Sequence, residues 1–236
     1  MVNRIINKIK KEIWKIANIR PDNLNFHWNI YPNSIEEEQF KIATTETAEY
    51  VNKKMSNLKG SKDPFEMTDH CISQANPKGL FLEFGIAFGN SINHIASKIN
   101  TIIHGFDSFK GLPEPWEDVK KGAFSTEGKL PRVRKNVRLY VGEFKDALPK
   151  FIQKHNESVS FLHVDSDLYS SAQTILYSLH NQIKKGTIII FDEYFNYPNW
   201  QKHEYKAFQE FVKKFKKEYE YIGYSKRGYS VGIRIL

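Results

Sequence analysis

Residues 80–91 read LFLEFGIAFGNS, a short apolar run that leads into a turn containing Gly85 and Gly89. Glycine tolerates the backbone angles of a sharp turn and lets the main chain approach a ligand closely. A helix that begins directly after such a turn aims its amide dipoles at the same place. The stretch therefore predicts a strand, a ligand-binding turn and a helix, although a turn that needs its glycines only for packing would leave the same pattern.

The alternation of strands and helices continues to the end of the chain. Further apolar runs cover 101–106, 137–141, 159–164 and 187–191, and helical patterns cover 91–99, 144–154, 170–184 and 202–217. Two last runs, 219–224 and 229–236, predict an antiparallel hairpin. Parallel strands followed by a hairpin are typical of a seven-stranded Rossmann-like methyltransferase sheet flanked by helices (fold class α/β). A dinucleotide dehydrogenase would continue with further strand–helix units.

The first seventy residues follow a different pattern. Residues 2–19 place isoleucines and Trp14 at helical spacing among lysines, which predicts a basic amphipathic helix, and residues 34–58 predict a second helix. The apolar face of the first helix either packs on the fold or on a second subunit, which we favour, or makes peripheral contact with an anionic membrane. We expect a helical N-terminal extension over residues 1–70 and a methyltransferase domain over residues 71–236.

Composition narrows the setting of the protein. The single cysteine, Cys71, excludes an intramolecular disulfide and fits a reducing compartment. No apolar run is long enough for a transmembrane segment, and lysines interrupt residues 1–19 too often for a signal peptide, so a cytoplasmic location is expected. The net charge of +8 comes mostly from scattered lysines, and no nucleic-acid-binding motif accompanies it, so we expect no nucleic-acid partner.

Acidic and aromatic residues around the glycine turn suit a nucleoside with a cationic aminoacyl group. Glu83 precedes the turn, where a carboxylate attracts such a cation and repels phosphate. Asp107 ends the second apolar run about twenty residues later, the position of a bidentate acceptor for two ribose hydroxyls. The cofactor-binding residues predicted at this end of the sheet are Glu83, Gly85, Gly89, Asn90, Ser91, Asp107, Ser108, Phe144 and Asp165.

Four carboxylates follow the fourth and fifth runs: Asp165, Asp167, Asp192 and Glu193. The carboxyl ends of parallel strands meet in one crevice, so these acids converge and repel each other unless a cation lies among them. A divalent cation would also lower the pKa of an acceptor hydroxyl. Alternatively, the acids cap helices, contact the cofactor or bind a cationic acceptor. Asp165 is the first candidate for the catalytic residue, as metal ligand or base, and His203 is the alternative base. His163 is expected to be a core residue.

Two long connections, 111–131 and 194–203, flank this crevice and are long enough to form lids or acceptor walls. Aromatic rings suit the face of a sugar, or of another flat polar acceptor. The predicted substrate-binding residues are Trp116, Tyr169, Tyr194 and Trp200.

Several phrases, spread over about residues 80–211, carry a resemblance to a known family. They are EFGIAFG at 83–89, GFDSFKGLPE at 105–114, KGAF at 121–124, GEF at 142–144 with LP at 148–149, HVDSDLY at 163–169, and DEY at 192–194. Together they resemble the macrocin O-methyltransferase (TylF-type) family of class I S-adenosylmethionine-dependent methyltransferases.

The resemblance implies S-adenosyl-L-methionine as methyl donor, a sugar hydroxyl as frequent acceptor, and magnesium (Mg²⁺) in characterised members. By position it implies Asp165, Asp192 and Glu193 as metal ligands, with Glu193 where a shorter Asp or Asn is more usual. It also implies dimers or larger assemblies, so we expect a homo-oligomer whose partner molecule is a small-molecule acceptor.

The leading prediction is therefore a metal-assisted O-methyltransferase that modifies a sugar or a glycosylated metabolite. One alternative is a metal-independent N-methyltransferase, in which Asp165 and Glu193 orient an amine. The other is a non-catalytic, nucleoside-binding Rossmann-like module. Such a module has no chemical need for four acids at one edge of the sheet, which favours an enzyme.

Overall fold

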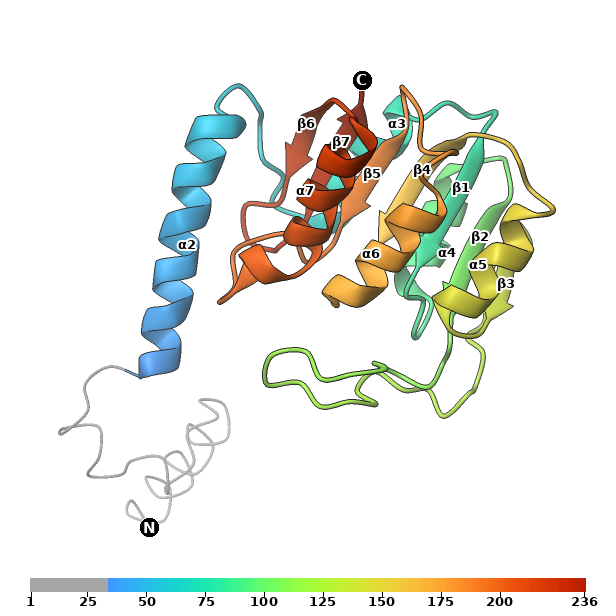
Figure 1. Cartoon of the computed structure of the whole chain (residues 1–236), viewed down its shortest axis with the longest axis horizontal. Helices are drawn as coiled ribbons and strands as arrows, with labels where there is room; N and C mark the ends of the chain where they lie inside the picture. Colours follow the sequence, from blue (N-terminus) through green and yellow to red (C-terminus); the bar gives the residue numbers. More distant parts are fainter. Residues whose placement is uncertain (1–33) are drawn as a thin grey trace, which may run out of the picture. The chain divides into compact units, whose positions relative to one another are not determined.

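The computed structural model describes residues 34–236, which contain a seven-stranded sheet in the order β3-β2-β1-β4-β5-β7-β6 (Figure 1). The first five strands are parallel, and β7 lies antiparallel between β5 and β6. This arrangement confirms the predicted fold class. The strands are β1 Leu80–Phe84, β2 Ile103–Asp107, β3 Val137–Val141, β4 Val159–Val164, β5 Ile188–Phe191, β6 Tyr219–Tyr224 and β7 Val231–Ile235.

Helices cover both faces of the sheet. Figure 1 shows α5, α6 and α7 on one face and α3 and α4 on the other, and each set packs its own apolar cluster against the strands. Because both faces are covered, β1, β4 and β5 are buried along their whole length, as continuous apolar runs require. The helices are α2 Ile35–Lys54, α3 Pro64–Gln74, α4 Asn90–Lys98, α5 Phe144–Ile152, α6 Tyr169–Ser178 and α7 Glu204–Phe215.

Several helices differ from their predicted bounds, and α2, expected over 34–58, ends at Lys54. The helix expected over 170–184 ends at Ser178, because the chain must turn back before β5. Gln182 fixes that turn by donating to the carbonyls of His155 and Glu157 at 2.8 and 3.2 Å. The helix expected from residue 202 begins at Glu204 and follows the short 3₁₀ turn Trp200–Lys202.

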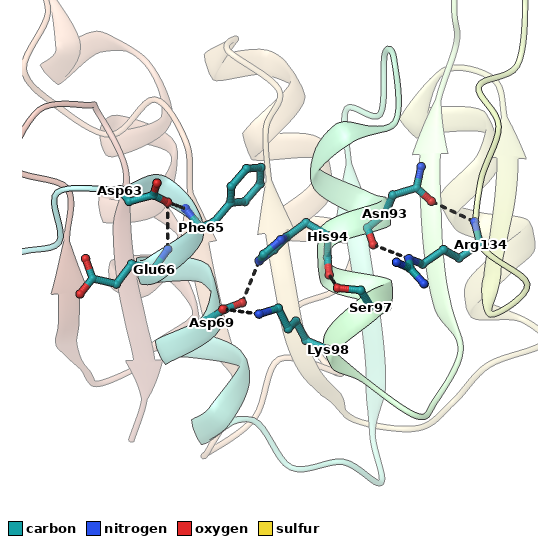
Figure 2. A network of polar contacts seen from close by, with 9 residues as sticks. All are labelled: Asp63, Phe65, Glu66, Asp69, Asn93, His94, Ser97, Lys98 and Arg134. Atoms are coloured by element: carbon teal, nitrogen blue, oxygen red, sulfur yellow. Dashed lines mark hydrogen bonds and ion pairs between the residues drawn. The ribbon is translucent and has the colours of Figure 1, made fainter.

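The sequence analysis missed helix α3, although its start has a clear signal. Asp63 caps the helix by accepting hydrogen bonds from the amides of Phe65 and Glu66, and Pro64 is its first residue. Figure 2 shows how α3 joins α4: the Asp69 carboxylate binds the His94 ring and the Lys98 ammonium at 2.7 and 2.6 Å.

The predicted N-terminal extension is described only in part. Its first helix, over residues 2–19, lies outside the described residues. Helix α3 begins inside the expected extension yet contacts β5, β6 and β7, and the boundary at residue 70 stays a prediction. In the part of the chain that the structure describes, no helix has the length and apolar character needed to cross a membrane.

Candidate active site

The glycine turn presses the carboxyl ends of three strands together. Gly85 has a φ of +89°, and a Cβ atom there would lie 1.7 Å from the carbonyl oxygen of Asp165, directly after β4. The amide of Gly85 also donates to the carbonyl of Phe106 in β2 at 3.0 Å. Gly89, with a φ of +81°, comes directly before α4. Only glycine fits at residue 85, because any side chain would separate β1 from β4.

Asp107 holds the glycine turn with both carboxylate oxygens. Oδ2 accepts hydrogen bonds from the amides of Ile86 and Ala87 at 2.7 and 2.8 Å, and Oδ1 accepts one from the amide of Phe109 at 2.7 Å. A carboxylate has about four acceptor positions, so one remains, on Oδ1. Asp107 is thus an organiser of the turn as well as a candidate ligand, and its bidentate contact with two ribose hydroxyls stays a prediction.

Glu83 lies below the turn in a buried ion pair. Its side chain is fully buried, and Oε1 is 3.3 Å from Nδ1 of His163, its register partner on β4. Burial alone would lower the pKa of His163, but the hydrogen bond to Glu83 raises that pKa to about 9. The histidine expected to be a plain core residue therefore neutralises the acid expected to face the cofactor. Oε2 of Glu83 is buried with no hydrogen-bond partner among residues 34–236.

A cavity of about 280 Å³ opens at the carboxyl edge of the sheet. It connects the glycine turn with the acids after β4 and β5. Its lining consists of Gly85, Ala87, Asp107, Gly111, Leu112, Pro113, Phe124, Phe144, Asp165, Ser166, Asp167, Ser171 and Glu193. The other five predicted cofactor residues are not part of this lining: Glu83, Gly89, Asn90, Ser91 and Ser108. The hydroxyl of Ser108 accepts from the amide of Lys110 at 3.2 Å.

Three carboxylates crowd one end of the cavity. Asp165, Asp167 and Glu193 each offer an oxygen atom, and these atoms lie within 4.8 Å of one another. Burial, and then the charge of Asp192, raises the pKa values of Asp165 and Glu193 well above their usual range. Burial also raises the pKa of Asp167 to about 6. These shifts express the cost of placing like charges together away from water, which a cation would remove.

The cluster differs from the ligand set that the resemblance implies. Asp167 belongs to it, and Asp192 does not: Oδ1 of Asp192 accepts a hydrogen bond from Ser230, beside β7, at 3.0 Å. Asp167 joins Asp165 because the turn after β4 takes a positive φ of 59° at that residue. The sequence spacing did not reveal this turn.

His203, the alternative base, lies outside the cavity lining. Its Nε2 is 2.7 Å from Oε1 of Glu117, and its ring contacts those of Trp116 and Tyr197. Asn199 also donates to Glu117, at 3.0 Å. His203 thus fastens the connection between β2 and β3 to the segment before α7. Trp116 belongs to the same contact and likewise does not line the cavity.

The other predicted substrate residues also lie away from the cavity. Tyr194 is fully buried, with its hydroxyl 2.8 Å from that of Tyr221, and Trp200 is buried with its ring against those of Tyr50 and Tyr205. The hydroxyl of Tyr169 donates to Glu210 at 2.5 Å. Large rings close to a sheet gain most by entering the core. The apolar wall of the cavity instead comes from Leu112, Pro113 and Phe124.

Comparison with known proteins agrees with this geometry. A family model described as a methyltransferase domain matches residues 82–194, the span from the glycine turn to the acids after β5. The calicheamicin methyltransferase CalS11 is similar with a TM-score of 0.54 and 20% identity, over 86% of this chain and 93% of that chain. The O-methyltransferase NovP is similar with a TM-score of 0.53 and 21% identity, over 72% and 78%.

An apo structure of CalS11, described as a TDP-rhamnose 3'-O-methyltransferase, has a TM-score of 0.51 at 18% identity, over 86% of this chain and 95% of that chain. No curated protein matches the chain significantly. At these identities the solved structures establish the fold, and the family match covers the residues that build the cavity. The matched domain, the strand order and the cavity together identify the chain as an S-adenosylmethionine-dependent methyltransferase.

Proposed function

We propose that this protein transfers a methyl group to a hydroxyl of a sugar or a glycosylated small molecule, with the assistance of a divalent cation. The observation that carries the proposal is the single cavity that joins the glycine turn and Asp107 to Asp165, Asp167 and Glu193. A donor bound at the first end would present its methyl group toward the acids at the second end. Such alignment is the main requirement of methyl transfer, since the sulfonium of S-adenosylmethionine supplies the activation.

The turn after β1 and the start of α5 would hold the donor. Gly85 and Ala87 leave main chain exposed to the cavity, Asp107 offers its remaining acceptor position, and the Phe144 ring is available for the adenine. Glu83 and His163, a buried pair beneath the turn, would act through the electrostatic field rather than by direct contact.

The acidic cluster fits a hard divalent cation such as Mg²⁺. Its donors are carboxylate oxygens, which Mg²⁺ prefers, and Oε2 of Glu193 is buried with no hydrogen-bond partner among the described residues. Asp165, Asp167 and Glu193 would hold the ion, which when bound would lower the pKa of an acceptor hydroxyl. Asp192 is not among these ligands, and its Oδ1 accepts a hydrogen bond from Ser230.

Asp165 is the residue that we propose for the chemical step. It follows β4 at the point where its carbonyl oxygen faces Gly85, so it is the acid next to the donor end of the cavity. Burial, and then the charge of Asp192, raises the pKa of its carboxyl group, so this group takes up a proton more readily than an exposed aspartate does. The proposed role is to hold the acceptor hydroxyl and receive its proton as the methyl group transfers.

A sugar hydroxyl is supported by two independent likenesses. The phrases at 105–114 and 163–169 resemble the macrocin O-methyltransferase family, and the similar solved structures include one described as acting on TDP-rhamnose. Leu112, Pro113 and Phe124, which line the same cavity as the acids, offer an apolar surface for a ring.

The test begins with calorimetric titration of the purified protein with S-adenosylhomocysteine, once with Mg²⁺ and once with EDTA. We expect micromolar binding, which would support the donor site. Transfer of radiolabelled methyl to a panel of nucleotide sugars is then measured under both conditions, and we expect turnover that needs Mg²⁺. Turnover on amino sugars that EDTA leaves unchanged would favour N-methylation, and no binding of S-adenosylhomocysteine would overturn the proposal.

A further inference from the structure

A further buried carboxylate, Glu204, lies behind the acidic cluster and has no part in the proposed chemistry. It is the first residue of α7 and is fully buried, and it does not line the cavity. A carboxylate in this position is costly, because burial and then the charge of Asp167 raise its pKa to about 8. Its contacts show what it contributes in return.

Both oxygens of Glu204 accept hydrogen bonds, and each bonds a different turn. Oε1 accepts from the amide and the hydroxyl of Ser166 at 3.3 and 3.2 Å. Oε2 accepts from the amide of Glu193 at 3.1 Å. Ser166 lies between Asp165 and Asp167 in the turn after β4, and Glu193 lies in the turn after β5. Glu204 therefore connects the two turns that carry the cluster.

These hydrogen bonds oppose the separation of the two turns, which repulsion within the cluster favours and to which the charge of Glu204 itself adds. Asp165 and Asp167 come from one turn and Glu193 from the other, and the like charges raise the energy of close approach. A side chain that bonds both turns from behind holds their spacing without entering the cavity. Only a carboxylate offers an acceptor to each turn, because glutamine would present an NH₂ group to one of the two backbone donors.

We infer that Glu204 is a positioning residue that sets the distance between the turn carrying Asp165 and Asp167 and the turn carrying Glu193. The inference rests on the proposed function only where it says that this distance matters for holding a cation. The bonds themselves stand independently of it, so the two statements can be tested apart.

The first experiment measures hydrogen exchange of single backbone amides by NMR. In Glu204→Gln at least one of the Ser166 and Glu193 amides should exchange about tenfold faster or more, and in Glu204→Ala both should do so. The amides of Asp165 and Asp192 are references, because they donate to the carbonyls of Phe84 and Val164 at 2.9 Å in each case. Glu220→Gln is the matched control, since Glu220 pairs with Arg234 on β6 and β7.

The second experiment measures affinity by calorimetry for Mn²⁺, used as the probe cation, and for S-adenosylhomocysteine. Glu204→Gln should weaken Mn²⁺ binding about tenfold or more, and change binding of S-adenosylhomocysteine by less than about threefold. A fragile fold would instead weaken both together, which would reduce Glu204 to a structural residue and overturn the inference.

The two experiments separate the possible failures. If wild-type protein binds no Mn²⁺, the role of a divalent cation in the proposed function is overturned. Amide exchange then still decides the role of Glu204. If both amides keep their wild-type exchange rates in Glu204→Gln and in Glu204→Ala, the inference is overturned whatever the cation does.

Discussion

Both halves of the carboxyl edge of the sheet contain acidic residues. In one half the protein neutralises or hydrogen-bonds them, and in the other half they repel one another. In the donor half, after β1 and β2, Asp107 accepts three backbone hydrogen bonds and Glu83 is paired with His163. In the acidic half, after β4 and β5, the carboxylates of Asp165, Asp167 and Glu193 lie close together, and burial and then the charge of Asp192 raise the pKa values of Asp165 and Glu193.

The difference shows which half is organised before a ligand arrives. Most of the acceptor positions of the donor half are met by the protein itself, so its turn has a fixed shape. The acidic half holds a repulsion that a bound cation would relieve, so ligand binding there should stabilise the fold strongly. The halves meet where Gly85 contacts the carbonyl of Asp165.

The largest loss of stability should come from a substitution at Gly85, where the two halves are in contact. Gly85→Ala would place a Cβ atom 1.7 Å from the carbonyl oxygen of Asp165, at a φ of +89°. Forcing β1 and β4 apart should cost about 3–5 kcal/mol of the free energy of unfolding, measured by urea denaturation, because neither backbone can yield freely.

Gly186→Ala is a closely matched control. Gly186 has a φ of +90°, but its Cβ would meet nothing within 4 Å. It should therefore cost only the backbone strain, about 1–2 kcal/mol. Equal losses in the two variants would mean that φ alone, and not contact between the two halves, makes glycine necessary at residue 85.

A smaller loss should follow from removing the charge that organises the donor half. Asp107→Asn keeps the size of the side chain but turns an NH₂ group toward backbone donors, so the turn should loosen. Affinity for S-adenosylhomocysteine should fall about 10- to 100-fold, as expected for lost hydrogen bonds to a charged group. Affinity for Mn²⁺, measured in the same way, should stay within about threefold. A parallel loss of both affinities would contradict the separation of the halves.

The fold could be predicted from the sequence because its signals are local. Apolar runs separated by helical periodicity located the seven strands. The helix end that differs most from its predicted position is at Ser178, and in the turn after it the Gln182 side chain donates to a carbonyl of a distant loop. Helix α3 was missed although Asp63 and Pro64 mark its start. The apolar periodicity that follows them is weak, so the helix does not stand out in the sequence.

The site was predictable only as far as strand ends determine it. Asp107, Asp165 and Glu193 reach the cavity because each follows a strand in a parallel sheet. Asp167, and not Asp192, belongs to the acidic cluster because of one positive φ angle, which the sequence does not reveal. The burial of Tyr194 and Trp200 depends on tertiary packing. Glu204 gave no signal, because its partners lie 38 and 11 residues away.

The acidic half predicts a gain of stability from a substitution. Asp167→Asn removes one of the repelling charges, so in EDTA the variant should unfold at a higher temperature than wild type, by a few degrees, or about 1 kcal/mol. Mg²⁺ should raise the melting temperature of the wild type and have little effect on the variant. Thermal scans by circular dichroism under both conditions measure this. A variant that is less stable in EDTA would show that Asp167 makes favourable contacts instead.

The smallest expected effect is a pH dependence at His104, which lies within β2, beneath the donor half. Burial, followed by the nearby His155, lowers the pKa of His104 from 6.5 to about 4. Between pH 6.5 and 4 the unfolded chain therefore binds a proton at His104 that the folded chain does not bind. The contribution of neutral His104 to the free energy of unfolding is complete above pH 6.5 and declines as the pH falls toward 4. In His104→Phe, which cannot titrate, the melting temperature should fall less between pH 7 and pH 5 than in wild type, by a few degrees. Equal slopes would mean that His104 accepts its proton inside the fold, and that the sheet beneath the donor half is more open to water than its packing against Phe151 and Tyr140 indicates.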